Sequence, residues 1–173
     1  RQNLRIIDKN RERLSTLVNQ LLDFRKIDSR KHIAMRQEID LKKLLSDIYE
    51  RFLKTSYTKH IEMLFELPEG DASVISDSDA LIKITDNLLA NALKFTSDRI
   101  LLQLQRNADR SFTIRVTDNG KGIPDRLKKL IFDPFYQIDK QDEKRGYGIG
   151  LSLVKNLSEV LEGQIRVSDA PGG

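Results

Sequence analysis

Polar residues that could bind a phosphate group recur along one predicted helix. Asn87 and Asn91 are four residues apart, so both amide groups lie on the same helix face. Lys94 follows one turn later and would place a positive charge near a phosphate. An amide oxygen is a hard, neutral ligand suited to Mg²⁺, which leans on substrate phosphates. Asparagine is a poor interior helix residue, so two on one face invite a functional explanation, although the pair taken alone is more typical of a solvated polar face.

Two glycine clusters bracket a charged segment further along the chain. The first cluster, DNGKGIP at residues 118–124, follows a predicted strand, and the second, GYGIGL at residues 146–151, opens a predicted helix. Glycine lets the backbone approach a ligand closely, and a helix N-terminus offers N–H groups to a phosphate. The intervening residues 133–145 carry many charges and no regular pattern. We interpret them as a lid over a nucleotide pocket, with a solvated loop as the alternative.

Particular residues in this stretch suggest how a nucleotide would be held. Asp118 would accept a hydrogen bond from the adenine amino group and repel the carbonyl oxygen of guanine, although a simple Asp-Asn-Gly turn is the alternative. The rings of Phe132 and Phe135 are expected to be buried and to anchor the lid. Lys144 and Arg145 could approach the γ-phosphate. His32 and His60 have no neighbouring acid–base group and are expected at strand edges.

The elements that must position these residues follow from hydrophobic periodicity. The pattern of residues 1–28 predicts a long helix with a wide apolar stripe. We favour one half of a helical hairpin in a dimeric bundle as its setting; the alternative is a helix that lies on its own domain. Asp40, and then Asp77 or Asp79, can cap two further helices. Gly163 is expected to end a last helix. Helices are predicted over residues 41–52, 80–95 and 151–161, and strands over 32–39, 61–67, 72–75, 100–104, 112–116 and 165–167. This pattern predicts an α+β sandwich, with a mixed sheet on one side and helices on the other.

Composition narrows the class of protein further. The chain has 173 residues, of which 39% are hydrophobic and 32% charged, so it can form one domain with a sizeable core. It has no cysteine, which excludes disulfides and thiolate metal sites. A net charge of +4 is small and gives little reason to expect nucleic-acid binding. No apolar run approaches the ~18 residues that a membrane span needs.

Taken together, the motifs resemble the catalytic ATP-binding domain of bacterial sensor histidine kinases. The sequence DNLLANALKFT at residues 86–96 resembles the N box, and DNGKG at 118–122 resembles the G1 box. FDPF at 132–135 resembles the F box, and GYGIGL at 146–151 the G2 box. Residues 1–30 resemble the second helix of a dimerisation and phosphotransfer hairpin. Residues 31–173 resemble the catalytic domain, a two-layer α/β sandwich called the Bergerat fold, whose last strand is expected to be absent from this sequence.

The resemblance implies a role for each matching residue. Asn91 would bind Mg²⁺, with Asn87 and Lys94 beside it as catalytic residues on the phosphates. Asp118 would bind adenine. Tyr147 stands where Thr or Ser is frequent in the family. The other implied ATP-binding positions are Gly120, Gly122, Ile123, Phe135, Arg145, Gly146, Tyr147, Gly148, Ile149, Gly150 and Leu151.

The resemblance also implies a reaction and partners. A two-component sensor histidine kinase transfers the γ-phosphate of ATP to a histidine, here expected on a hairpin helix absent from this sequence, and then to an aspartate of a response regulator. Related ATPases carry Glu where this helix has Asn87, and an amide cannot take a proton, which favours transfer over hydrolysis. The implied assembly is a homodimer, and the chain would be the cytoplasmic portion of an inner-membrane sensor, without direct nucleic-acid or membrane contact. The alternatives are a Bergerat ATPase and a degenerate kinase that only dimerises.

Overall fold

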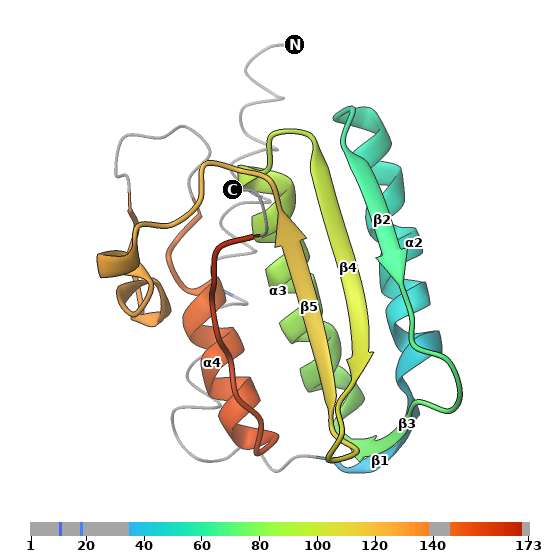
Figure 1. The fold of residues 1–173 in the computed structure, drawn as a ribbon. Helices are drawn as coiled ribbons and strands as arrows, with labels where there is room; N and C mark the ends of the chain where they lie inside the picture. The colour runs from blue at the N-terminus through green and yellow to red at the C-terminus, as the bar shows by residue number, and fades with distance from the viewer. Residues whose placement is uncertain (1–10, 12–17, 19–34, 139–145, 171–173) are drawn as a thin grey trace.

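The computed structural model describes residues 11, 18, 35–138 and 146–170 of the chain (Figure 1). Apart from residues 11 and 18, which are both helical, the long helix predicted for residues 1–28 lies outside the described residues, and so do the predicted lid residues Lys144 and Arg145. Within the described part no helix is both long and apolar enough to cross a bilayer.

Two small sheets form the strand layer of the molecule. In the larger one, the central strand pairs in parallel with one neighbour and antiparallel with the other, in the order β2 (Glu62–Glu66), β4 (Arg99–Arg106), β5 (Phe112–Asp118). The smaller sheet is an antiparallel pair of β1 (Gln37–Asp40) and β3 (Ser73–Ser76). The parallel β2–β4 pair requires a crossover, which the helix between them supplies.

Three helices make up the second layer. They are α2 (Leu41–Thr58), α3 (Ser78–Phe95) and α4 (Gly150–Val160). Figure 1 shows α2 and α3 on one face of the larger sheet and α4 beside α3, next to the β5 edge, which confirms the predicted α+β sandwich of helices against strands. Both predicted aspartate caps are present, because the Asp40 carboxylate accepts the N–H groups of Lys42 and Lys43 and that of Asp77 accepts the N–H of Ala80. Two short 3₁₀ turns, η1 (Asp125–Leu127) and η2 (Leu130–Phe132), precede the lid.

The core follows the predicted periodicities. Along β4, Ile100, Leu102 and Leu104 point inward and are at most 2% exposed, which is the alternation of a half-buried strand. These side chains pack on α2 and α3 through residues such as Leu45 and Leu89. A second cluster fills the space between α3 and α4 and consists of Ala80, Ile84, Leu153, Val154 and Leu157.

The C-terminal part differs from the sequence prediction. No strand forms at residues 165–167, so that prediction was wrong. Among the described residues, no backbone hydrogen bond joins residues 164–170 to β5, and both segments line one hollow that separates them. Residues 165–167 pair with no strand in the described part of the chain, and an alternating pattern without pairing does not produce a strand.

The end of α4 also differs in detail. Glu162, not Gly163, takes the left-handed conformation, with φ of 60°. The N–H of Gly163 bonds the carbonyl of Ser158 at 2.8 Å, and that of Glu162 bonds Glu159 at 3.0 Å, which is a Schellman motif. The predicted helix end is therefore correct, but Gly163 occupies the position after the left-handed residue.

Candidate functional site

The topology brings the end of β5 to the end of α3. Helix α3 ends at Phe95, and β4 starts only four residues later, at Arg99. Since β5 runs antiparallel to β4, Asp118 at its end pairs with Ile100 at the start of β4. Asp118 therefore lies at the end of the sandwich where α3 finishes.

Asn119 joins these two segments by hydrogen bonds. Its side-chain oxygen accepts the N–H groups of Asp98 at 3.2 Å and Arg99 at 3.0 Å, and it lies 2.9 Å from the hydroxyl of Thr96. Its amide nitrogen donates to the Asp98 carboxylate at 2.7 Å. Asn119 thus joins the turn after α3 to the end of β5, where Asp118 lies. Sequence reasoning missed this role, because the Asp-Asn-Gly motif indicates only a turn.

At Gly120, the next residue, the backbone after β5 lies close to the backbone at the end of α3. A methyl group added to Gly120 would lie 2.3 Å from the carbonyl oxygen of Phe95, so only glycine fits between the end of β5 and the end of α3. The N–H of Gly120 also donates to Oδ1 of Asp118 at 2.9 Å, which fixes the carboxylate. The other carboxylate oxygen, Oδ2, remains for a ligand donor.

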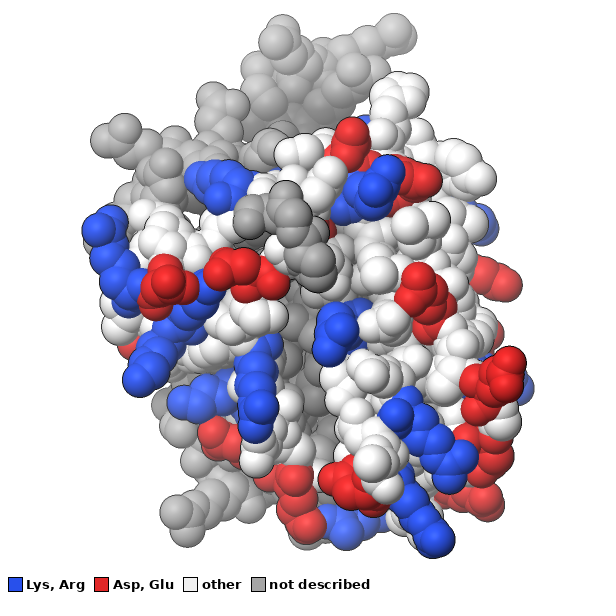
Figure 2. Space-filling model, in the orientation of Figure 1, with Lys and Arg blue, Asp and Glu red and all other residues white. Residues whose placement is uncertain are grey.

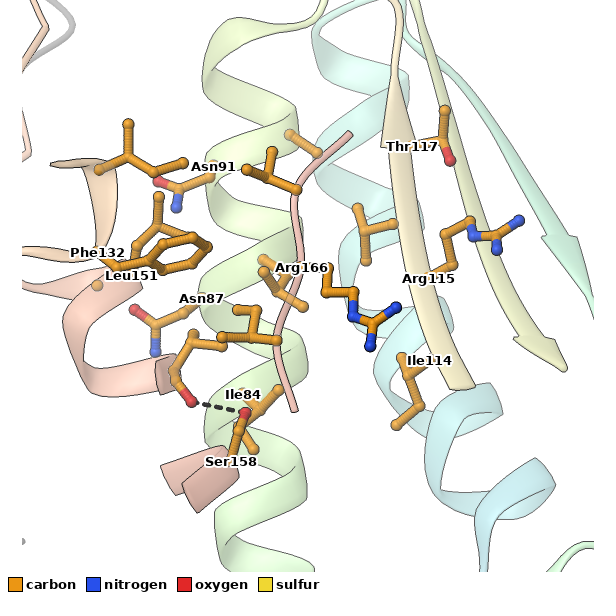
Figure 3. Close-up of a pocket in the computed structure, with 18 of the residues that line it drawn as sticks. Ile84, Asn87, Asn91, Ile114, Arg115, Thr117, Phe132, Leu151, Ser158 and Arg166 are labelled. Carbon is orange, nitrogen blue, oxygen red and sulfur yellow. Dashed lines mark hydrogen bonds between the residues drawn. The ribbon is translucent and has the colours of Figure 1, made fainter. Parts of the chain in front are cut away.

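The polar face of α3 lies along the same hollow. Figure 3 shows Asn87 and Asn91 on the side of α3 that faces Phe132 and Leu151. The Asn87 amide nitrogen donates to the carbonyl of Lys83 at 2.7 Å. The oxygen of the same amide is therefore directed away from the α3 backbone. A methyl group on Gly150 would lie 2.9 Å from that oxygen, which places it beside the start of α4.

The first turn of α4 completes this side of the hollow. Helices α2 and α3 begin with an aspartate cap, whereas the capping position of α4 is Ile149, whose side chain makes no capping hydrogen bond. The first N–H groups of a helix have no partner within the helix, and together with the helix dipole they attract anions. Because Gly150 and Leu151 line the hollow, this helix start is suited to a phosphate.

Two hydrogen bonds join residues 133–138, the start of the predicted lid, to the glycine cluster at 146–150, and we call these two segments the lid flanks. The N–H of Phe135 donates to the carbonyl of Gly148 at 2.8 Å, and the Gln137 side chain donates to the carbonyl of Gly146 at 2.9 Å. Phe135 and Gly148 both take left-handed conformations, with φ of 66° and 71°. The Phe135 ring is 61% exposed, so the prediction that it is buried was wrong; the turn points it outward, whereas Phe132 is half-buried.

The structure brings most of the sequence-predicted residues to one hollow. Phe135 and Ile149 do not line it, since Phe135 points outward and Ile149 is buried at 1% exposure, and Arg145 lies outside the described residues. Phe132 and Tyr136 line it without having been assigned a ligand contact. The predicted positions that line it are Asn87, Asn91, Lys94, Asp118, Gly120, Gly122, Ile123, Gly146, Tyr147, Gly148, Gly150 and Leu151.

Charge is distributed without a dominant sign on the face above the hollow. Figure 2 shows acidic and basic side chains interspersed there, so local groups rather than a broad field would select a ligand. Lys128 forms ion pairs with Asp125 at 2.6 Å and Asp169 at 2.7 Å. The hydrogen bond from Lys128 lowers the pKa of Asp125, and the bonds to Asp125 and Asp169 raise the pKa of Lys128. This bridge ties η1 to the C-terminal segment.

Comparison with known proteins identifies the family. Residues 76–173, more than half of the chain, match the family of histidine kinase-, DNA gyrase B- and HSP90-like ATPases. The sensor histidine kinase TmoS of Ectopseudomonas mendocina is 37% identical over 172 residues, covering 97% of this chain but only 18% of TmoS.

Solved structures agree with this match. Full-length ShkA in complex with AMPPNP superposes with a TM-score of 0.87 at 25% identity, covering 98% of this chain and 35% of ShkA. The histidine kinase ThkA in complex with the response regulator TrrA has the same fold, with a TM-score of 0.74 at 24% identity over 94% of this chain and 45% of ThkA. The chain thus belongs to the family of histidine kinase-, DNA gyrase B- and HSP90-like ATPases, and the relatives that it matches over almost its whole length are sensor histidine kinases.

Proposed function

We propose that this chain binds ATP in the hollow between α3, the end of β5 and the start of α4, as the catalytic part of a sensor histidine kinase. The observation that carries the proposal is that Asp118, at the end of β5, and the asparagines Asn87 and Asn91, on α3, line the same hollow. Asp118 would accept the adenine amino group, and the uncapped start of α4 would bind phosphate.

The residues at this site fit a magnesium ion that is held largely by the nucleotide. Among the described residues, no cluster of three or more His, Cys, Asp or Glu side chains could hold a metal. The amide oxygen of Asn91 would instead contribute a neutral oxygen ligand to the metal, with Asn87 beside it on the phosphates. A bound Mg²⁺ would neutralise charge on the phosphates, as phosphoryl transfer generally requires.

Asn87 favours transfer of the phosphoryl group over hydrolysis. An amide has no proton-accepting state near neutral pH, so Asn87 cannot activate a water molecule as a carboxylate would. Lys94, in the last turn of α3, lies at ordinary contact distance of 3.5 Å from a methyl group placed on Gly146, so its ammonium is at the lid flank. It would orient the phosphates and balance their charge.

We extend the proposal to the longer protein, because the chain spans only a small part of its relatives. The phosphate would move from ATP to a histidine on a helix outside this sequence, and then to an aspartate of a response-regulator receiver domain. ThkA, which shares the fold, was solved with a response regulator bound. The protein would act as a homodimer whose catalytic part is on the cytoplasmic side of an inner-membrane sensor.

Titration with a fluorescent ATP analogue tests the nucleotide site directly. We expect Mg²⁺-dependent binding that ATP displaces and GTP does not. Asp118→Asn should weaken binding about tenfold, because an amide nitrogen would face the adenine amino group; that factor corresponds to ~1.4 kcal/mol. Asp71→Asn is the matched control, since Asp71 is exposed, bonds only Ser73 among the interactions described, and does not line the hollow.

The outcomes separate the possible functions. No binding by the folded chain would refute the nucleotide site and leave a degenerate kinase. Equal displacement by GTP would refute the role of Asp118. In a longer protein that includes the acceptor helix, acid-labile phosphate on the protein supports the kinase, whereas steady phosphate release without a phosphoprotein would indicate an ATPase.

A further inference from the structure

We infer that Asp77 is a positioning residue that couples the segment entering the domain, residues 35–37, to the helix that carries the nucleotide-site side chains. The inference rests on the proposed function, because the site that it couples is the ATP site. It adds a second role to a residue whose predicted role was only to cap α3.

Asp77 is the one ionisable side chain among the described residues that is buried, at 4% exposure. Its two carboxylate oxygens serve two different segments. Oδ1 accepts the N–H of Ala80 at 3.0 Å, which caps α3, and Oδ2 accepts the N–H of Met35 at 2.9 Å, across 42 positions of sequence. Capping alone needs a single oxygen and is done equally well by Ser or Asn. The second oxygen therefore gives aspartate a purpose that capping does not explain.

Neighbouring residues of the entering segment are held at the same end of the domain. The Gln37 side chain donates to the hydroxyl of Ser78, the first residue of α3, at 2.7 Å. Arg36 forms an ion pair with Glu162, the left-handed residue after α4. Figure 1 shows the start of α3 and the end of α4 at the same end of the molecule, next to β1. The entering segment is thus attached to both helices that line the nucleotide site.

Helix α3 can carry a displacement from Asp77 to the site. It is continuous from Ser78 to Phe95, and ten residues separate Asp77 from Asn87, or about 15 Å of helix. The second core cluster joins α3 to α4 through Ala80 and Leu153, among others, so the two helices pack as one unit. A well-packed interface passes a small shift on instead of absorbing it, because it has few alternative arrangements. Movement at residues 35–37 and occupancy of the site should therefore affect each other.

Substitutions can remove the link to Met35 while leaving the cap. Asp77→Ser keeps a capping oxygen but has no second oxygen for Met35. Met35→Pro removes the N–H donor itself, and Met35→Ala is its matched control, because it keeps the N–H and alters a side chain that is 81% exposed. Both uncoupling variants break the hydrogen bond between Met35 and Asp77, from opposite ends, so the double variant should uncouple no more than Asp77→Ser alone.

The test measures amide hydrogen exchange at residues 36 and 37, with and without a saturating non-hydrolysable ATP analogue and Mg²⁺. In the wild type and Met35→Ala, nucleotide should slow exchange about fivefold, the lower end of typical coupling between sites. In Asp77→Ser and Met35→Pro, the slowing should fall below about twofold while the Kd for nucleotide changes by less than about threefold. A residue that only stabilised the fold would raise exchange throughout α3 without abolishing the nucleotide effect.

Contrary results would identify which idea fails. Equal slowing in all variants would overturn the coupling role of Asp77, and so would a large loss of nucleotide affinity in Asp77→Ser, which would make the residue part of the site's stability. If the wild type bound no nucleotide, the proposed function would fail instead. The structural link would then be refuted separately if Asp77→Ser and Met35→Pro left exchange at residues 36 and 37 unchanged without ligand.

Discussion

The contact between the two lid flanks predicts that Gly148→Ala disrupts the site while Gly146→Ala, two residues earlier in the same cluster, does not. Gly148 has φ of 71°, and an added methyl group would lie 2.6 Å from the carbonyl carbon of Phe135 and 2.7 Å from the carbonyl oxygen of Tyr136. Both are backbone atoms, which cannot rotate away as a side chain can. At Gly146, the nearest atom of the described residues to an added methyl is the Lys94 ammonium at 3.5 Å, which is ordinary contact.

Two effects determine how much strain Gly148→Ala should introduce: the left-handed backbone conformation and the overlap of the added methyl group with backbone atoms. A left-handed conformation costs a non-glycine residue about 1–2 kcal/mol. Overpacking against well-packed neighbours adds about 1–3 kcal/mol. We therefore expect about 2–5 kcal/mol of local strain for Gly148→Ala and less than about 0.5 kcal/mol for Gly146→Ala. The lid flank can relieve this strain by opening locally, so the loss should appear in nucleotide binding more than in global unfolding.

Two measurements check this expectation. Gly148→Ala should weaken binding of the ATP analogue at least tenfold, or more than about 1.4 kcal/mol, and Gly146→Ala should leave it within about twofold. The amide of Phe135, which donates to the Gly148 carbonyl at 2.8 Å, should exchange with solvent much faster in Gly148→Ala. If Gly148→Ala bound nucleotide like the wild type and kept the Phe135 amide protected, the steric argument would be refuted.

Three further predictions concern the adenine side of the site and the C-terminal segment. Gly120→Ala should cost about 1–3 kcal/mol in urea unfolding, because its methyl group meets the Phe95 carbonyl at 2.3 Å; an unchanged unfolding midpoint would contradict this packing. Asn119→Ala should weaken nucleotide binding more than it lowers stability, because its hydrogen bonds are exposed yet hold the residues beside Asp118; equal affinity in a titration would show that Asn119 does not position the site. In an NMR titration the Asp125 carboxyl should have a pKa below its ordinary 3.8, because Lys128 hydrogen-bonds it, and Lys128→Met should return the pKa to that value. Since the folded-state pKa is lowered, any stabilisation from this pair is present above pH 3.8 and is lost as the pH falls through the lowered pKa; an unchanged pKa in the variant would refute the assignment.

Local patterns were sufficient to predict the regular elements. Asp40 and Asp77 each precede a helical pattern, and each caps the helix that was expected. The alternation of Ile100, Leu102 and Leu104 predicted a strand with one buried face, which the structure confirms. In both cases the information lies within one or two turns of chain, so neighbouring residues determine the outcome. Asn87 and Asn91 likewise share one face as soon as the helix forms, because they are four residues apart.

Predictions failed where the outcome depends on a distant segment. Residues 165–167 alternate like a strand, but no neighbouring strand pairs with them in the described part of the chain. The Phe135 ring was expected to be buried, but the left-handed turn that meets Gly148 directs it outward. The second hydrogen bond of Asp77 reaches a residue 42 positions away. No local pattern contains that contact, because it is determined by where the entering segment crosses the start of α3.

The difference between local patterns and distant contacts also limits what the motifs reveal about the candidate site. They indicate which residues belong to it, but not what each residue does there. The matched motifs mark places where a backbone must approach a ligand or another segment, and those places are visible as glycines and short polar residues. What they do not show is which constraint acts at each position. Gly120 is required by the Phe95 carbonyl, whereas no described residue comes closer than 3.5 Å to a methyl group placed on Gly146. Asn119 bonds the turn after α3, so the wall that carries Asp118 and the helix that carries Asn91 are held together. The proposed adenine and phosphate contacts would therefore depend on one shared joint, and a change at Asn119 should affect the binding of both ends of the nucleotide.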